Sequence, residues 1–373
     1  MKTTFNTYIQ LLILSILAIF FTSVVSFEYY PDYLNLNERI KNNHSTFDFT
    51  VQKVFIDILN NFKKHQIYNM SDFTNLTFFI FNLLVCFFLV TFGVLSDKIN
   101  KNNKYDQINF NFITALCFPS ILLSITAISS EALYTILSIY IVSKINFSKG
   151  PFCLSVFSLL LLAYAFLLDK GNFFVLAIFI IGYIFFTFLV KYSNLKLFFF
   201  FIIIFSIFFW FLGLNLFVLV VSLFDNDKVI EIVDTIKRLN LYELSINELI
   251  SRVVYFWITL TSLNLGDNNF STVAILFYFY ISLILFKKLS QKSIIKEFKN
   301  YFSNRYNLVL FIWLFLFPIL FLKILPTHAF GKYYLFYIVI ILKIFSLVLN
   351  RNQIYVIFVA FSLLSLVEKF LLL

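Results

Sequence analysis

The residues that could do chemistry in this chain include two acids set beside or within apolar sequence. Glu131 stands in "FPSILLSITAISSEALYTILSIYIVSK" and is the only charged residue between Asp106 and Lys144. Asp32 follows the first apolar run, in "FEYYPDYLNLNER", directly after Pro31. Because an ionised group near membrane depth is costly to place, each of these acids raises a functional question.

Five further groups lie at the ends of apolar runs or in longer polar loops. They are Arg39, Lys170, Arg252, His328 and Lys332. Acids and cations that meet over a membrane suit a reaction on a lipid pyrophosphate. The cations would stabilise the leaving pyrophosphate, and a carboxylate would take a proton from an attacking sugar hydroxyl. The same groups suit an ion-coupled transporter, so both classes of protein stay open.

Structural roles fit some of these residues equally well. Glu131 in "SSEAL" has the position of a helix N-cap or first-turn acid. The stretch "LLDKGN" around Lys170 has the composition of a plain tight turn. The tyrosines that flank Asp32 are typical of an aromatic belt at a membrane surface. The type of residue alone therefore does not separate a catalytic from a structural role.

The composition decides the class of protein in which these residues must work. The chain is 61% hydrophobic and 13% charged, whereas about 25% of the residues of a soluble domain are charged. Apolar runs of roughly 18 residues or more recur along the sequence, long enough to cross a hydrocarbon core of about 30 Å. Backbone amides in lipid must pair internally, so these runs predict helices. The expected fold class is all-α, a polytopic helical integral membrane protein.

The predicted organisation is a single transmembrane domain, residues 1–373, with about eleven transmembrane helices. Lysines gather in the short loops on one side, which predicts a cytoplasmic N-terminus. Two outer loops, about 27–75 and 224–270, are longer than the others. The expected spans lie at roughly 8–26, 76–96, 109–128, 131–146, 151–168, 173–190, 197–223, 271–287, 307–325, 331–349 and 354–372.

Each long outer loop contains a segment with the pattern of an amphipathic helix. Apolar residues recur at helical spacing between Val51 and Phe62 in the first loop. In the second loop, a possible capping box, Ser245-x-x-Glu248, precedes a similar set. We expect both helices to lie in the outer membrane interface, apolar face down. The apolar set of the second is Leu249, Ile250, Val253, Val254 and Trp257.

Several functional classes are disfavoured by the sequence. Cys86, Cys117 and Cys153 all fall inside apolar runs and are typical of small hydrophobic residues rather than a disulfide or metal set. No ligand cluster requires a metal, and no cofactor motif is present. The net charge of +10 is explained by cytoplasmic loop lysines, so we expect a lipid bilayer and no nucleic acid as partner.

Four stretches together carry a family resemblance. They are "YYPDYLN", "FPSILLSITAISSEALYTILSIYI", "LAYAFLLDKGN" and "LPTHAFGKYYLF". In these motifs and in its layout the chain resembles the bacterial O-antigen and capsule repeat-unit polymerases, the Wzy type. Those proteins are membrane glycosyltransferases of the GT-C class.

The resemblance implies a polymerase in the bacterial inner membrane that acts at the periplasmic face. It would move the growing glycan from undecaprenyl pyrophosphate onto the next lipid-linked oligosaccharide, with a flippase and a chain-length regulator as partners. Asp32 would be the acid near the acceptor, Glu131 would lie at the rim of the site, and the lysines of "LDKGN" and "FGKYY" would meet the pyrophosphate. One departure is that lysine stands where a bidentate, phosphate-binding arginine is expected.

Two other functions remain open on the sequence. A GT-C transferase with a polyprenyl-phosphate sugar donor would usually show a paired acidic motif, but Glu28 and Asp32 are not adjacent. A flippase or transporter for lipid-linked sugars would carry charged residues along a path within the spans. Lys323 and Lys343 instead lie near predicted span ends, where long side chains can reach water.

Overall fold

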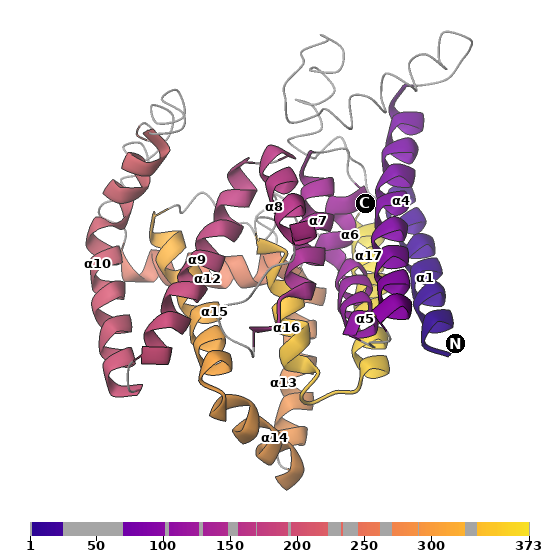
Figure 1. Cartoon of the computed structure of the whole chain (residues 1–373). Coiled ribbons are helices and arrows are strands. Elements are labelled where there is room, and N and C mark those ends of the chain that lie inside the picture. The colour runs from indigo at the N-terminus through magenta and orange to yellow at the C-terminus, as the bar shows by residue number, and fades with distance from the viewer. Residues whose placement is uncertain are drawn as a thin grey trace.

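The chain forms a bundle of helices (Figure 1). The computed structural model describes residues 2–24, 70–100, 104–126, 130–147, 156–168, 170–192, 195–222, 233, 245–261, 271–289, 291–324 and 334–372. Within these residues there are helices and short connections but no β-strand. The all-helical prediction is confirmed for this part of the chain.

The helices follow the order of the predicted apolar runs, with two additional helices between them. Their bounds are α1 (Lys2–Val24), α4 (Met70–Asn100), α5 (Lys104–Leu116), α6 (Pro119–Thr126), α7 (Ser130–Lys144), α8 (Val156–Leu168), α9 (Lys170–Tyr192), α10 (Leu195–Ser222), α12 (Ile246–Thr261), α13 (Thr272–Leu289), α14 (Lys292–Ser303), α15 (Arg305–Ile324), α16 (Tyr337–Phe345) and α17 (Arg351–Leu372). The additional helices are α12 and α14.

Four of these helices are long and apolar enough to cross a membrane by themselves. They are α9, α10, α15 and α17, and the bent pair α5 and α6 would make a fifth span. Shorter apolar helices occupy residues 6–22, 80–95 and 132–144. The chain therefore has the character of a helical membrane protein, while the number of about eleven crossings stays a prediction.

The expected span at 109–128 is wrong as a single helix, because it is broken in the middle. Helices α5 and α6 meet at an angle of 79° on either side of Cys117 and Phe118. Pro119 begins α6, and since proline has no N–H to donate and disfavours a helical residue before it, the break falls there. Every residue of α6 is buried. The broken helix thus carries the stretch "FPSILLSIT" into the interior of the bundle.

Polar side chains tie the broken helix to its neighbours. The Ser120 hydroxyl donates to the backbone carbonyl of Leu260 in α12 at 2.6 Å, and the Asn82 amide of α4 donates to the carbonyl of Ile125 at 2.8 Å. The Ser362 hydroxyl of α17 donates to the carbonyl of Cys117. The last two bonds satisfy carbonyls of the bent helix, and the first satisfies a carbonyl in the last turn of α12, which would otherwise be unpaired in an apolar interior.

Helices α9 and α15 approach closely because one of them carries a glycine at the contact. The buried Trp313 indole of α15 donates its N–H to the carbonyl of Phe179 at 2.8 Å. Its ring lies against Gly182, where an added Cβ would be 2.3 Å from the indole Cζ2 atom. Small residues at such contacts let two membrane helices pack without a gap. This contact holds α15 against the middle of α9.

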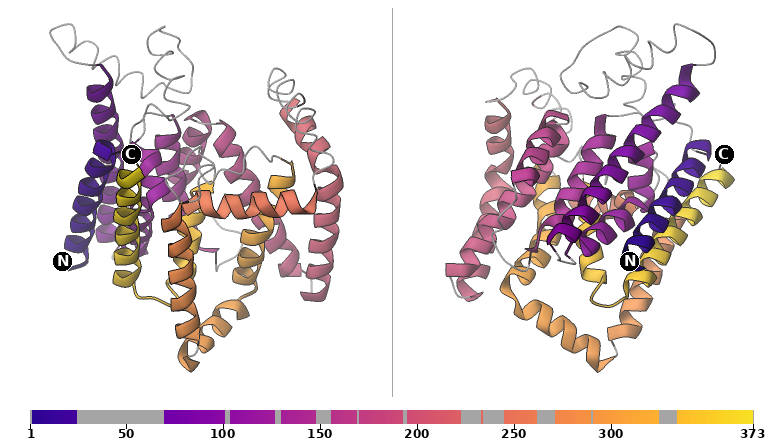
Figure 2. Two further views of the ribbon diagram at one scale, coloured as in Figure 1. Left: turned by 180° about the vertical axis from the view of Figure 1, so that it is seen from behind. Right: turned by 45° about the vertical axis from the view of Figure 1, so that its right-hand side comes forward.

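Helix α12 lies crosswise to α13, as Figure 2 shows. The predicted capping box is confirmed: Ser245 N–H donates to the Glu248 carboxylate at 2.8 Å, and Glu248 N–H donates to the Ser245 hydroxyl at 3.2 Å. The predicted apolar face is only partly correct. Leu249 is buried, but Ile250 and Val254 are exposed, because the inward face follows positions 249, 253, 256 and 260 at helical spacing. The first predicted amphipathic helix lies outside the described residues.

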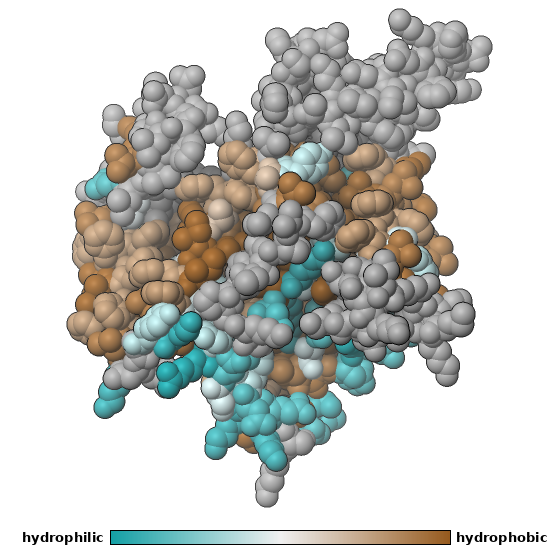
Figure 3. Space-filling view, in the orientation of Figure 1, coloured by the Kyte–Doolittle hydropathy of each residue, from teal (hydrophilic) through white to brown (hydrophobic). Residues whose placement is uncertain are grey.

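Basic residues gather at one end of the bundle, where α14 also lies. They stand at the ends of α7, α9 and α13 and at the starts of α10, α15 and α17, and Figure 3 shows hydrophilic residues on this lower side. The N-terminal end of α1 points to the same side in Figure 1. The lysines at the predicted inner ends of these helices thus lie on one side of the bundle, and which side faces the cytoplasm stays a prediction. The residues are Lys144, Lys191, Lys196, Lys287, Lys288, Arg305 and Arg351.

Candidate functional site

The predicted site residues fall into two groups with respect to the described part of the chain. Arg252 is described in full, and Glu131 and Lys170 are described by their place in a helix. The others lie outside the described residues, so their roles stay predictions. These are Asp32, Arg39, His328 and Lys332.

The helix starts that carry Glu131 and Lys170 lie side by side. Glu131 is the second residue of α7, and Lys170 is the first residue of α9. One turn after Glu131, the buried Tyr134 hydroxyl donates to the backbone carbonyl of Asn172 at 2.8 Å. This bond joins two of the sequence stretches on which the family resemblance rests.

Two helix N-termini that meet make a favourable place for negative charge. The unpaired N–H groups of a first turn and the helix dipole give each terminus a partial positive charge. That field would stabilise an acid in the first turn of α7, where Glu131 lies, which is the structural interpretation of "SSEAL". The same field would also hold a phosphate, so the functional interpretation of this rim stays open as well.

A second charged group forms where α12 packs against α15. Arg252 of α12 is half-buried, and its charge lies within electrostatic range of Lys323 and Glu248. The Lys323 ammonium stands over the Trp210 ring of α10, 5.0 Å from its centroid. Two cations and one exposed acid therefore share one region. It lies near the C-terminal end of α15, whereas the basic helix α14 lies at the N-terminal end of α15 (Figure 1).

The charge in this region is positive after Glu248 is counted. Glu248 has a pKa below its ordinary value, first because the Ser245 backbone N–H bonds to its carboxylate, then because of the Ser245 hydroxyl and the charge of Arg252. It is therefore ionised at neutral pH and balances one cation. Within the described ranges, neither Arg252 nor Lys323 makes a direct ion pair. The pair keeps a net positive charge that an anion could neutralise.

Lys323 is the residue that the sequence interpretation missed. Its position near the end of the predicted span 307–325 suggested only a side chain that reaches toward water. The available signal was the side on which it lies: basic residues are depleted in outer loops, so a lysine at an outer span end is unusual. Its proximity to Arg252 depends on how α12 lies across α15, which the sequence does not show.

Two other charged residues have structural partners. The Lys343 ammonium of α16 donates to the carbonyls of Val142 and Ile145, at 2.9 and 2.8 Å, and lies 4.8 Å from the Phe147 ring centroid. The expectation that Lys343 reaches toward water is therefore wrong: the amine caps the end of α7, where helix carbonyls lack partners.

Glu368 acts in a similar way at the opposite end of the bundle. Its carboxylate accepts the Ser271 hydroxyl at 2.6 Å and the Val273 N–H at 3.1 Å, so α17 caps the start of α13. A carboxylate at a helix N-terminus is stabilised by the helix dipole. Both Lys343 and Glu368 thus have a packing role that needs no substrate.

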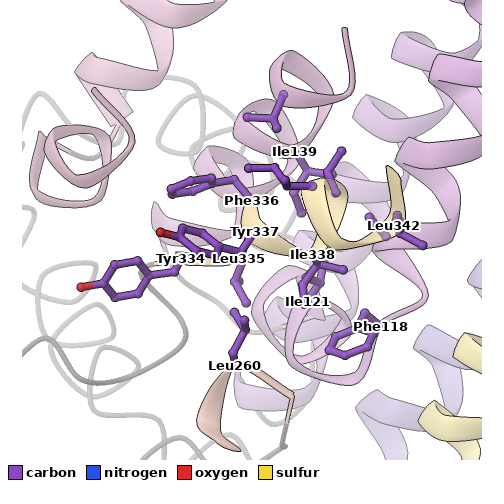
Figure 4. Close-up of a cluster of buried hydrophobic side chains, with 14 of the residues drawn as sticks. Phe118, Ile121, Ile139, Leu260, Tyr334, Leu335, Phe336, Tyr337, Ile338 and Leu342 are labelled. Carbon is purple, nitrogen blue, oxygen red and sulfur yellow. The ribbon is translucent and has the colours of Figure 1, made fainter. Parts of the chain in front are cut away.

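Residues 334–337, the described end of the stretch "LPTHAFGKYYLF" and the first residue of α16, lie against α12 and the broken helix. Tyr334 and Tyr337 are buried at the start of α16, and Figure 4 shows their rings pointing to the same side. Phe256 of α12 packs edge-on against Tyr334, with ring centroids 4.6 Å apart. Among the described residues the Tyr337 hydroxyl has no hydrogen-bond partner. This arrangement brings a third resemblance stretch next to the helix that carries Arg252.

The residues that the structure describes include no group of three or more His, Cys, Asp or Glu side chains that could hold a metal ion. No protein-family model matches the chain, and neither a characterised protein nor a solved structure is significantly similar to it.

Proposed function

We propose that this chain is a membrane glycosyltransferase that polymerises lipid-linked oligosaccharide repeat units in O-antigen or capsule synthesis. The observation that supports this most is that two cations, Arg252 of the crosswise helix α12 and Lys323 of α15, lie within electrostatic range of each other. A net positive site suits the pyrophosphate of a polyprenyl lipid. The neighbouring starts of α7 and α9 offer a second place for negative charge.

In the proposed reaction, a hydroxyl of the incoming lipid-linked unit attacks the anomeric carbon of the growing glycan. The bond from that carbon to the pyrophosphate oxygen breaks, and undecaprenyl pyrophosphate leaves. The Asp32 carboxylate takes the proton of the hydroxyl. Cations stabilise the charge that develops on the pyrophosphate. The proposed substrate-binding residues are Arg39, Lys170, Arg252, Lys323, His328 and Lys332. Glu131 is proposed as a second catalytic carboxylate at the edge of the site.

The proposed setting is the bacterial inner membrane, with a cytoplasmic N-terminus and about eleven crossings. The reaction would then take place at the periplasmic face. A flippase would deliver the lipid-linked units to that face, and a chain-length regulator would set the size of the product. The basic ends of the helices on the side of α14 support this orientation.

The length distribution of surface polysaccharide tests this function in a host that lacks the gene. We expect the ladder of the parent strain to collapse to single repeat units. An intact ladder that lacks one side sugar would instead indicate a transferase with a polyprenyl-phosphate donor. Loss of all surface material, with lipid-linked units held inside, would indicate a flippase. Either of the last two patterns overturns the polymerase.

The cation pair gives a sharper prediction. Replacing Arg252 or Lys323 by Gln is expected to lower polymerisation by roughly 10- to 100-fold, because a hydrogen bond to a charged group contributes about 1.5–3 kcal/mol. If both cations bind one pyrophosphate, the double variant will lose less than the product of the two single losses. The rate of polymer formation in membranes supplied with lipid-linked units measures this.

Lys369→Gln at the end of α17 is the control for removal of a lysine elsewhere, and we expect it to keep the parental rate. Losses that multiply fully would mean that Arg252 and Lys323 act at separate places. Unchanged rates in both single variants would exclude the pair from substrate binding. Helicity in detergent verifies that each variant is folded.

A further inference from the structure

Helix α14 has two surfaces of different chemistry. Ile294 is buried and Phe298 is half-buried against the rest of the bundle. Lys296 and Lys299 are exposed on the other side of the helix. The helix is strongly amphipathic, and it lies across the ends of α13 and α15 rather than along them (Figure 1). This is the pattern of a helix at a membrane surface.

Specific contacts hold α14 in this position. The Asn307 amide at the start of α15 donates to the carbonyl of Tyr301 at 3.1 Å. Phe302 packs edge-on against Phe311 of α15, with ring centroids 5.1 Å apart. The orientation of the exposed lysines is therefore set by the fold and does not require a ligand.

The exposed surface combines positive charge with apolar side chains. Lys287 and Arg305, at the adjoining ends of α13 and α15, are exposed like the two lysines of α14, and the exposed acid among them is Glu297. Ile295 is 50% exposed and Phe286 is 80% exposed. Ile295 and Lys299 are four residues apart, so they share one face of the helix. An apolar side chain next to a lysine matches the boundary between acyl chains and headgroups.

We propose that α14 and the adjoining ends of α13 and α15 bind anionic phospholipid headgroups of the leaflet on that side. Charge complementarity selects this occupant: the surface is strongly basic, and each lysine or arginine near an anionic leaflet contributes about 1 kcal/mol, or about fivefold in affinity. The exposed Ile295 and Phe286 favour a lipid over a soluble acidic partner, because they would contact its acyl chains. This binding does not depend on the proposed glycosyl transfer.

The test compares lipid selectivity of the full-length protein in nanodiscs. The discs contain phosphatidylcholine with a trace of spin-labelled phosphatidylglycerol or spin-labelled phosphatidylcholine, and electron paramagnetic resonance measures the fraction of each label held at the protein. We expect the parental protein to prefer phosphatidylglycerol. In the double variant Lys296→Gln/Lys299→Gln, the affinity for phosphatidylglycerol relative to phosphatidylcholine should fall by about 25-fold if the two charges act additively. It should fall by about fivefold if only one of them contributes.

A matched control removes two lysines from the same side of the bundle but away from α14. Lys191→Gln/Lys196→Gln changes exposed lysines at the end of α9 and the start of α10. We expect it to lower the preference by less than the α14 double variant, and Lys296→Arg/Lys299→Arg to keep the parental preference. An equal loss in the control would show that net charge alone attracts the lipid, which overturns the proposal. No preference in the parental protein, or binding of single-stranded DNA or of an acidic peptide in place of phosphatidylglycerol, would overturn it too.

Discussion

Asp32→Asn is expected to abolish polymer while the amount of folded protein stays at the parental level. An amide has nearly the shape of the carboxylate but cannot take the proton of the attacking hydroxyl. General-base catalysis contributes about a hundred- to ten-thousand-fold to a rate, so almost no ladder should remain. Gel analysis of surface polysaccharide, beside an immunoblot of the membrane fraction, measures both quantities. Full-length polymer from this variant would remove Asp32 from the mechanism.

Two companion variants define what the result means. Glu28→Gln changes an acid in the same segment, and we expect an unchanged ladder, whereas the polyprenyl-phosphate donor alternative needs both acids. Glu131→Gln is expected to lower polymer without lowering the amount of protein if its carboxylate acts on the substrate. If it lowers only the amount of folded protein, Glu131 is a first-turn acid that stabilises the start of α7.

Gly182→Ala is expected to destabilise the bundle by about 3 kcal/mol, at the upper end of the usual range for overpacked sites. The new Cβ would lie 2.3 Å from the Trp313 ring. The ring cannot move aside cheaply, because it is buried and its N–H bonds to the carbonyl of Phe179. Helices α9 and α15 must therefore separate. Thermal unfolding of the detergent-solubilised protein, followed by tryptophan fluorescence, should show a clearly lower Tm.

Gly93→Ala is the matched control in the same chain. Its Cβ would lie 2.6 Å from Oδ1 of Asn109, a buried amide that is smaller than the Trp313 ring and makes a longer hydrogen bond, 3.3 Å to the carbonyl of Val90, so it can shift at lower cost. We expect a loss of about 1 kcal/mol, at the low end of the same range. Since Trp313 causes the clash at Gly182, Gly182→Ala should cost less in a Trp313→Leu background than in the parent. Equal costs in both backgrounds, or a larger loss at Gly93, would contradict this account of the α9–α15 contact.

Much of the fold could be predicted from the sequence because lipid and water act on each segment separately. Long apolar runs must be helices in a hydrocarbon solvent, and helices occur at the predicted positions within the described residues. The bond between Ser245 and Glu248 was predictable because its partners are three residues apart. The gathering of lysines at one end follows from a rule that applies to each loop independently.

The sequence alone did not reveal how the charged side chains are paired. Lys343 bonds to the carbonyl of Val142, 201 positions away, and Glu368 bonds to Ser271, 97 positions away. Lys323 comes within electrostatic range of Arg252 because α12 packs across α15, and it stands over Trp210 of α10. A local pattern assigns such residues to a span end but carries no information about what stands opposite them.

The sequence by itself therefore determined that this protein has the character of a membrane protein, where its helices lie along the chain and on which side its lysines gather. The tertiary structure decided which charged side chains are hydrogen-bonded to backbone groups, as Lys343 and Glu368 are, and which form a region of net positive charge, as Arg252 and Lys323 do. It also decided that the stretch after Cys117 turns into the interior, since the bonds from Ser120 to Leu260 and from Ser362 to Cys117 join distant segments. In an apolar interior each such polar partner is needed, because an unpaired polar group is costly there.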